Sequence, residues 1–455
     1  MPLLIISELR VWHGNCIVYW QIIIVNDMRY FRQALALMRE EKLYSAMYIA
    51  GTALAVAFVM LIAEVYYVKV ADIAPEVRRS TTYYLDAMRM LNEKSELEAV
   101  RHETYRDLFQ KMQTPECITG DMDMWTNTPY YITQADSVHE YSVKGKLTDA
   151  GFFRLYQFHF IEGAPFTQDD FDNGRNVVVI TEELRDQLFG HGQKGVSQTL
   201  TLNRLAFRIC GVVETPSALT EKCAADIWIP YTNEDFLKSA GASYLEMPLS
   251  LTFSVPAAKR LAFLQEMKAV EARYNAMHKD EPVDMTARLQ SHYEEVWTGI
   301  GSVFNAWGGN LLWYVTPAIL LLLLVPALNL SGMVASRMER RLPEMAVRKA
   351  FGAKRRTLLG EVVMENLVLT LIGGIVGLCL AWAALYGWRD WVFNVFSDSY
   401  KLYGTVPLLK GEMFFGPAVF AIALLVCCVL NVLAATLPAW LSLRKPIVES
   451  MMIKK

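Results

Sequence analysis

Charged side chains gather in one short stretch of this sequence, between two long apolar runs. The cations are Arg337, Arg340, Arg341, Arg348, Lys349, Lys354, Arg355 and Arg356, and the carboxylates among them are Glu339, Glu344 and Glu361. Cations at this density bind anionic lipid headgroups or the carboxylates of a partner protein. The stretch also carries Met345, Val347 and Phe351 among its charges. Apolar anchors beside charges favour protein docking, whereas a purely cationic loop is typical of a lipid-facing flank.

Catalytic and metal-binding patterns are missing from the sequence. Residues 190–197 (GHGQKGVS) resemble a phosphate-binding loop only superficially, and the two His-Glu pairs, at 102–103 and 139–140, lack the second histidine of H-E-x-x-H. The seven histidines show no ligand spacing. We therefore expect a protein that is not an enzyme, with no metal or cofactor bound by this chain.

The cysteines leave one question open. None of the seven forms a metal-binding spacing. Cys210 and Cys223 would form a disulfide in an oxidising compartment or would remain packed free thiols.

Long apolar runs on either side of the basic stretch fix the topology. Runs at 46–67, 311–333, 366–388 and 413–441 are long enough to cross a bilayer as helices. Short loops rich in Lys and Arg stay on the cytoplasmic side, and the basic stretch, the residues before the first run and the C-terminal tail are all basic. The sequence predicts an α-helical, multi-pass protein of the cytoplasmic (inner) membrane with four transmembrane helices.

The region between the first and second spans must then lie outside the cytoplasm. Apolar runs and alternation predict strands at 176–180, 198–202, 205–213, 226–230 and 249–255, with a hairpin turn at Asn203-Arg204. A short helix is expected from Thr181, with Glu182 and Glu183 in its first turn. Helical spacing of Leu261, Leu264, Met267, Val270, Tyr274 and Met277 predicts an amphipathic helix at 257–278. We expect an α+β extracytoplasmic domain. Residues 69–90 and 289–307 should be helical stalks that pair with each other.

Two further features bear on partners and on the start of the chain. The charges are nearly balanced, at a formal net charge of −3, with no basic stripe outside the membrane flanks, which argues against nucleic acid. Residues 1–27 contain an apolar run too short to span a bilayer. We interpret them as a wrongly assigned start before Met28, the alternative being an interfacial anchor.

Helix signals within the basic stretch predict a short surface helix from Pro343 to Phe351. Proline suits the first helical position, Glu344 suits the positive N-terminal end, and Gly352 suits the C-terminal cap. In the spans, Asn329 and Glu365 are intramembrane polar residues, and the buried carboxylate of Glu365 needs a cationic or backbone partner. Gly373 and Gly377 have the spacing that lets helix backbones approach closely.

The basic stretch also resembles a known family. Residues 344–353 (EMAVRKAFGA) are similar to the E-I-G-V-R-K-A-L-G-A signature of FtsX-like/MacB-like ABC transporter permeases, and differ from it at Met345, Ala346 and Phe351. The likeness continues through Glu365 and the glycines at 373, 374 and 377, and through 438–451, where Lys445 replaces an acidic residue. Segments at 151–163, 177–190 and 207–213 follow the order of the MacB-like periplasmic core domain, so that the resemblance covers residues 28–455.

This resemblance implies a function and a division of the chain. It implies a permease subunit, paired as a homodimer or with a related permease, that a separate cytosolic ABC ATPase drives by binding ATP and Mg. Met345, Val347, Arg348 and Phe351 would contact the ATPase, and Glu344 and Lys349 would orient the docking helix. The expected parts are 1–27, the doubtful start; 28–68, a cytoplasmic amphipathic segment and the first span; 69–308, the MacB-like core domain with stalk helices; and 309–455, the FtsX-like domain with three spans and a short cytoplasmic tail.

Three roles remain open for such a permease. One is export of a substrate by mechanical transmission, with a periplasmic adaptor and an outer-membrane channel as further possible partners. The second is release of lipoproteins from the membrane. The third is regulation of a cell-wall hydrolase or peptide sensing, without transport.

Overall fold

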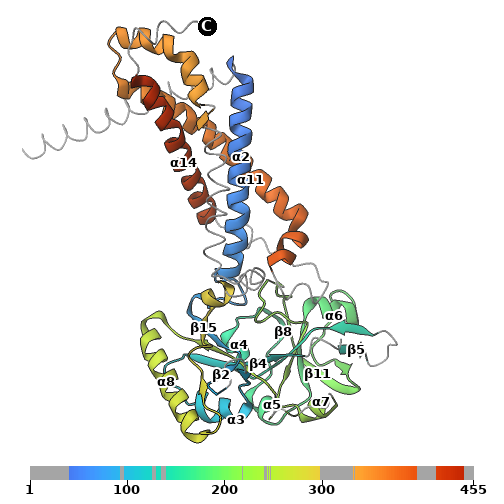
Figure 1. The fold of residues 1–455 in the computed structure, drawn as a ribbon. Helices are drawn as coiled ribbons and strands as arrows, with labels where there is room; N and C mark the ends of the chain where they lie inside the picture. Colours follow the sequence, from blue (N-terminus) through green and yellow to red (C-terminus); the bar gives the residue numbers. More distant parts are fainter. Residues whose placement is uncertain are drawn as a thin grey trace, which may run out of the picture. The chain divides into compact units, whose positions relative to one another are not determined.

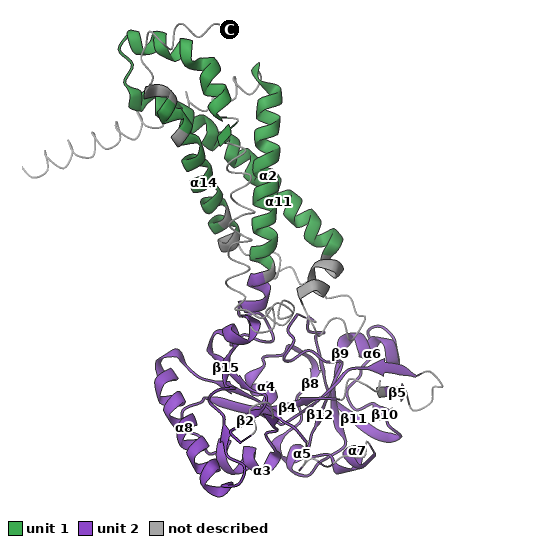
Figure 2. Ribbon diagram, viewed as in Figure 1, with its two compact units in different colours: residues 1–65, 309–389, 414–455 green, residues 66–308, 390–413 purple. Residues whose placement is uncertain are grey.

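A computed structural model describes most of the chain. It covers residues 40–297, apart from gaps at 93–96, 125–129, 135–139, 218, 240–242, 244 and 246, together with 331–396 except 333, and 417–444. The described chain divides into two compact units, one formed by helices from both ends of the sequence and one by the residues between them (Figure 2). The N-terminal segment before residue 40, Asn329 and nearly all of the predicted second span lie outside the described residues.

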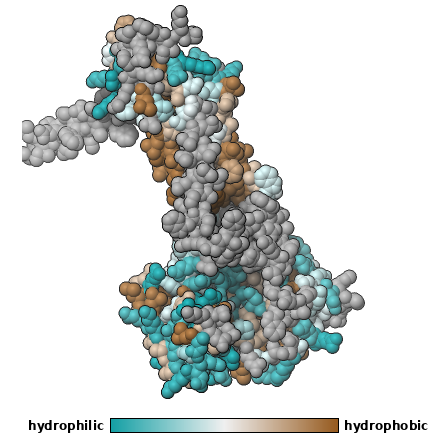
Figure 3. All heavy atoms as spheres, viewed as in Figure 1, coloured by the Kyte–Doolittle hydropathy of each residue, from teal (hydrophilic) through white to brown (hydrophobic). Residues whose placement is uncertain are grey.

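The first unit is helical. Its long elements are α2 (Lys42–Val70), a helix over residues 334–350, α11 (Arg355–Phe396) and α14 (Pro417–Arg444) (Figure 1). Within the described residues, three helices are long and apolar enough to cross a membrane, namely Lys42–Val70, Arg355–Trp388 and Phe420–Leu441. They correspond to the first, third and fourth predicted spans. Figure 3 shows hydrophobic side chains gathered on the surface of this unit, as a bilayer requires.

Buried side chains of these helices form two small clusters. In one, Tyr48 of α2 packs with Met338 of the 334–350 helix, Leu358 of α11 and Ala439 of α14. In the other, Val56 and Met60 of α2 pack with Ala381 of α11 and Cys427 of α14. The buried side chains of these helices therefore pack against neighbouring helices of the unit.

The second unit is an α+β domain between the first span and the later helices. Its strands are β1 (Thr82–Leu85), β2 (Met88–Met90), β3 (Leu97–Glu98), β4 (Cys117–Asp123), β5 (Tyr130–Gln134), β6 (Tyr141–Val143), β7 (Gly145–Thr148), β8 (Phe160–Gly163), β9 (Val177–Thr181), β10 (Thr199–Leu202), β11 (Leu205–Val213), β12 (Ile227–Pro230), β13 (Ser250–Ser254), β14 (Val283–Asp284) and β15 (Gln290–Ser291). Its helices are α3 (His102–Thr104), α4 (Phe152–Leu155), α5 (Gln168–Asp172), α6 (Glu182–Phe189), α7 (Glu234–Ser239) and α8 (Arg260–Met277).

Most of these strands belong to one mixed sheet. Among the described residues, the strand order is β15-β1-β13-β4-β7-β12-β9-β11-β10-β5-β6, with β8 paired to β11, and β14-β2-β3 form a separate small sheet. Two neighbouring pairs, β9 with β11 and β7 with β12, are parallel. The predicted α+β class is therefore correct for this domain.

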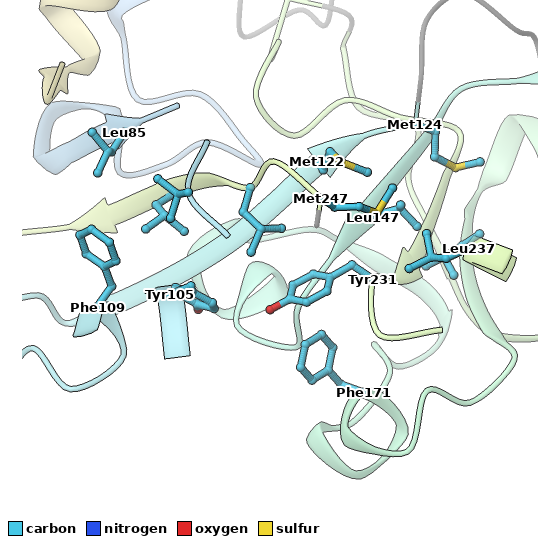
Figure 4. Close-up of a cluster of buried hydrophobic side chains, with 14 of the residues drawn as sticks. Leu85, Tyr105, Phe109, Met122, Met124, Leu147, Phe171, Tyr231, Leu237 and Met247 are labelled. Carbon is cyan, nitrogen blue, oxygen red and sulfur yellow. The ribbon is translucent and has the colours of Figure 1, made fainter. Parts of the chain in front are cut away.

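The large sheet is buried on both faces. On β12, Ile227 and Ile229 enter the main core, whereas Trp228, which lies between them, enters a second aromatic core with Phe152. Alternate residues of a strand point to opposite faces, so one strand serves two cores. Figure 4 shows part of the main core, in which the rings of Phe171 and Tyr231 lie edge to face with centroids 4.8 Å apart.

Several predicted elements are confirmed. The hairpin joins β10 to β11, and its turn residues Asn203 and Arg204 have positive φ, of 50° and 66°. Helix α6 begins after Thr181, whose hydroxyl accepts a hydrogen bond from the Leu184 amide at 3.3 Å. Helix α8 buries Met267, Val270 and Tyr274 as expected, but Leu261 and Met277 at its ends are exposed.

The predicted stalk helix over 69–90 is wrong. Helix α2 ends at Val70, a cis Ala74-Pro75 bond follows, and β1 and β2 occupy 82–90. Tyr83 and Leu85 are buried in the main core as residues of β1. Their apolar side chains therefore pack as part of the sheet and not along a helix. The return segment is helical at 292–297, and Trp297 meets Tyr66 of α2 with ring centroids 5.7 Å apart. Among the described residues the return segment therefore meets the end of α2, and residues 298–307 of the predicted stalk lie outside them.

Candidate functional site

The predicted docking helix is the C-terminal part of a longer one. Residues 334–350 are helical throughout, so Pro343 lies inside this helix and does not begin it. The prediction of a separate helix that starts at Pro343 is therefore wrong, because a membrane-protein helix tolerates an internal proline when its neighbours satisfy the freed backbone groups. The predicted end is confirmed. Gly352 has φ of +94°, and the Ala353 amide donates to the Arg348 carbonyl at 3.1 Å, which is the expected glycine cap.

The side chains of this segment divide into an exposed set and a buried one. Phe351 is 89 % exposed, and Val347 is 42 % exposed. Met345 is 7 % exposed and packs in the helical core with Val334 and Met338, so we correct its assignment from a contact residue to a packing residue. Val347 and Phe351 are the exposed apolar residues to which the predicted contact still applies; together with Arg348 they form what we call the docking face.

Arg348 is held by two carboxylates. Its guanidinium donates to Glu344 at 2.6 Å, one turn earlier, and to Glu361 of α11 at 3.0 Å. Glu344 thus holds the Arg348 side chain, and Lys349, the next residue, is partly exposed. The predicted role of Glu344 and Lys349 in orienting the docking helix stays a prediction. Glu361 was missed by sequence reasoning, since nothing in the spacing pairs α11 with the preceding helix.

Glu365 lies in a buried ion network. It contacts Arg337, and Arg341 donates to its other oxygen at 2.9 Å. Arg337 also reaches Glu41 at 2.8 Å and lies over the Tyr44 ring, 4.5 Å from its centroid. These are the cationic partners that a buried carboxylate requires. They join α11 to the helix of the basic stretch and to α2.

Gly373 and Gly377 bring α11 against α2. A Cβ at Gly377 would lie 2.5 Å from the Ala53 carbonyl oxygen, and one at Gly373 would lie 2.8 Å from Thr52 Cβ. The close packing that this spacing predicts is therefore between helices of one chain.

A polar chain through the spans was missed. Thr370 of α11 meets the Tyr48 hydroxyl at 3.3 Å and accepts from Asn431 of α14 at 3.1 Å. Asn431 within an apolar run was the available signal, since polar side chains in lipid-spanning helices seek partners across helices.

In the described part of the chain, the side chains that could bind a metal are not clustered. Over these residues, no group of three or more His, Cys, Asp or Glu side chains could hold a metal ion. Cys210 and Cys223 are free thiols, bonded to the Val178 and Thr220 carbonyls at 3.3 and 3.6 Å, which agrees with the packed-thiol alternative.

Two protein families match this chain. Residues 45–262 match the MacB-like periplasmic core domain, and residues 318–447 match the FtsX-like permease C-terminal family.

Individual relatives are distant. An uncharacterized ABC transporter permease, YvrN of Bacillus subtilis, is 22% identical over 68% of this chain and 73% of its own length. The macrolide export ATP-binding/permease protein MacB of Photorhabdus laumondii is 22% identical over 54% of this chain, but only 37% of its own length. The chain thus spans about a third of the fused ATP-binding/permease relatives it matches. The crystal structure of the periplasmic region of MacB from Actinobacillus actinomycetemcomitans aligns with 47% of this chain and 89% of its own, at 14% identity and a TM-score of 0.35.

Proposed function

Because this chain is an ABC transporter permease that joins a MacB-like periplasmic core domain to an FtsX-like permease domain, we propose that it couples ATP hydrolysis by a separate cytosolic ATPase to movement of its extracytoplasmic domain. The membrane would be the cytoplasmic one. The permease would act as a homodimer or paired with a related permease. Export of a substrate is the proposed outcome, since distant relatives bear the names of macrolide and pyoverdine exporters.

One observation carries the ATPase part of this proposal. Phe351, an aromatic side chain 89 % exposed, lies at the end of a basic helix within the FtsX-like domain, beside Val347 and Arg348. A large apolar side chain flanked by an oriented arginine is the usual composition of an interface hot spot. In a loop that the positive-inside rule assigns to the cytoplasm, the fitting partner is a cytosolic protein.

The residues of this chain include no phosphate-binding loop, so we assign ATP and Mg to the partner. The fused ATP-binding/permease relatives support this division of labour, since the match to them is confined to part of their length. A periplasmic adaptor and an outer-membrane channel would be further partners of an exporter.

A direct test compares nucleotide states. The full chain, in lipid nanodiscs with the ATPase that co-purifies with it, would be analysed by hydrogen exchange without nucleotide and with Mg-ATP plus vanadate. We expect nucleotide to change exchange in peptides of the extracytoplasmic domain. Unchanged exchange there, in a complex that hydrolyses ATP, would contradict the proposal.

A further inference from the structure

The C-terminal end of α2 is held by side chains that come from elsewhere in the α+β unit. The last carbonyls of a helix lack partners within the helix. Here the Arg79 guanidinium donates to the Val68 carbonyl at 2.7 Å and to the Ala71 carbonyl at 3.0 Å. Cationic groups at a helix C-terminus are also favoured by the helix dipole. Arg79 therefore caps the helix where it leaves the first span.

Arg79 connects this helix end to a distant loop. It donates to the Leu219 carbonyl at 3.2 Å and to one oxygen of Glu76 at 2.6 Å. The other Glu76 oxygen accepts from the backbone amides of Lys222 and Cys223, at 3.0 and 3.2 Å. Glu76 and Arg79 are both 3 % exposed. Loop 219–223 is thus bonded to α2 through one buried ion pair.

A second cap comes from the segment that leaves the domain. His292 Nε2 lies 2.7 Å from the Lys69 carbonyl, so it carries the proton and donates. His292 Nδ1 then accepts from the Tyr84 hydroxyl of β1 at 3.0 Å. Lys69 also reaches Glu221 with its ammonium at 3.3 Å. Three parts of the domain that are far apart in the sequence, β1, loop 219–223 and the return segment, are therefore bonded together at one helix end.

We call Glu76, Arg79 and His292 the α2 clasp. A buried ion pair is weak support for stability, because desolvation offsets its attraction, and apolar side chains of the same shape often do as well. Directional hydrogen bonds, in contrast, fix the position of the groups that they join. Apolar packing lets a helix end slide or rotate, whereas bonds to the Val68, Lys69 and Ala71 carbonyls fix both its depth and its rotation.

We propose that the α2 clasp is the joint through which movement of the first membrane helix reaches the extracytoplasmic domain, with Arg79 as its positioning residue. This inference rests on the proposed function. Both the entering and the leaving connection are bonded at the clasp, so a displacement of α2 moves β1, loop 219–223 and the return segment together. Without it, the helix end shifts and the domain does not follow.

The test replaces Arg79 with lysine in the full chain. Lysine keeps the charge beside Glu76, but one ammonium cannot serve the carbonyls of Val68, Ala71 and Leu219 as well. The matched control is Arg185→Lys. Arg185 is a buried arginine of the same domain, bonded to Asp186 at 2.6 Å and to Glu162 at 3.2 Å, and it makes no contact with the clasp among the described residues.

Hydrogen exchange, ATP hydrolysis and thermal unfolding would be measured on each complex, with and without Mg-ATP and vanadate. We expect Arg79→Lys to retain ATPase binding and hydrolysis and to lose the nucleotide-dependent change in exchange at 82–134 and 219–231. Arg185→Lys should lower the unfolding temperature to a similar extent and keep that change. A purely structural role for Arg79 would affect both variants alike, and that result would overturn the inference.

A second pair of variants guards against misfolding of Arg79→Lys. His292→Gln can still donate to the Lys69 carbonyl, whereas His292→Phe cannot. We expect His292→Gln to keep the nucleotide-dependent change in exchange and His292→Phe to lose it. An equal change in both variants would overturn the inference. A wild-type complex without any nucleotide-dependent change would overturn the proposed function itself, and so the two failures are distinguishable.

Discussion

The charge of His292 is set by its surroundings. Burial lowers its pKa from the ordinary value near 6.5, because an imidazolium is poorly solvated in the interior. Several charged or titratable groups face the ring: Glu76, Arg79, Lys222 and Tyr84, besides the Lys69 carbonyl. The two cations lower the pKa further, whereas Glu76 and the carbonyl raise it. The net result is an uncharged ring at neutral pH.

Acid should therefore weaken the domain through this residue. The unfolded chain takes up a proton near pH 6.5 and the folded chain only at lower pH, so stability is complete above 6.5 and is lost as the pH falls below it. We expect the unfolding temperature of the full-length protein, followed by tryptophan fluorescence, to fall more steeply from pH 6.5 to 5 than that of His292→Gln. The control His159→Gln removes an exposed histidine and should follow the wild type. Parallel curves for wild type and His292→Gln would show that His292 does not titrate in this way.

Glu365 should be among the most sensitive residues of the spans. Its removal leaves Arg337, 7 % exposed, and Arg341 without their shared carboxylate. Breaking a buried pair costs about 3–5 kcal/mol, and the remaining contact of Arg337 with Glu41 puts Glu365→Ala at the lower end, about 3 kcal/mol. Unfolding in detergent would measure the loss. Glu361→Ala breaks a more exposed pair one turn away and should cost about 1 kcal/mol or less; equal losses would refute the difference in burial.

At the scale of elements, two glycines of one helix give a matched pair. Gly377 lies against the Ala53 carbonyl of α2, whereas a Cβ at Gly360, also in α11, would meet nothing within 4 Å. Alanine favours a helix over glycine by about 0.5–1 kcal/mol. We therefore expect Gly360→Ala to raise the unfolding temperature and Gly377→Ala to lower it, because the second pushes α2 away. A rise in both would mean that α2 and α11 do not approach closely at Gly377.

Elements with local signals were predictable from the sequence, and elements without them were not. Asn203-Arg204 between alternating runs encodes a hairpin turn, and Thr181 before two glutamates encodes a helix start. The end of α2 at Val70 was not predictable. The groups that bond its last carbonyls are Arg79, which lies beyond the helix, and His292, which is distant in the sequence. The helix through Pro343 failed for a similar reason, since neighbouring helices decide whether a proline ends a helix.

At the scale of the whole molecule, charge and hydropathy were enough for the order of parts. The candidate membrane helices and the α+β unit lie in the sequence where the apolar runs and the basic flanks predict them, although the second span lies outside the described residues. The docking face was only partly predictable: Phe351 and Val347 are exposed, but Met345, in the same run, is buried by packing against α11 and the rest of its own helix. Which side of a helix is covered depends on its neighbours, and the sequence of one helix does not specify them.

The central claim is that a cytosolic ATPase binds the docking face. The most direct measurement is purification of the tagged full chain from solubilised native membranes, with co-purifying proteins identified by mass spectrometry. Phe351→Asp, Arg348→Glu and the control Arg356→Glu would be compared with the wild type. Arg356 is an exposed cation of the same basic stretch, outside the docking face.

We predict that an ABC ATPase accompanies the wild type and Arg356→Glu, and that its yield falls about tenfold or more with Phe351→Asp and Arg348→Glu, as loss of an interface hot spot requires. If the basic stretch were instead a lipid-facing flank, the three variants would not differ in this way: loss of either arginine would have the same effect on the yield, and Phe351→Asp would have none. Recovery of no ATPase with the wild type, or equal recovery with Phe351→Asp, would contradict the account.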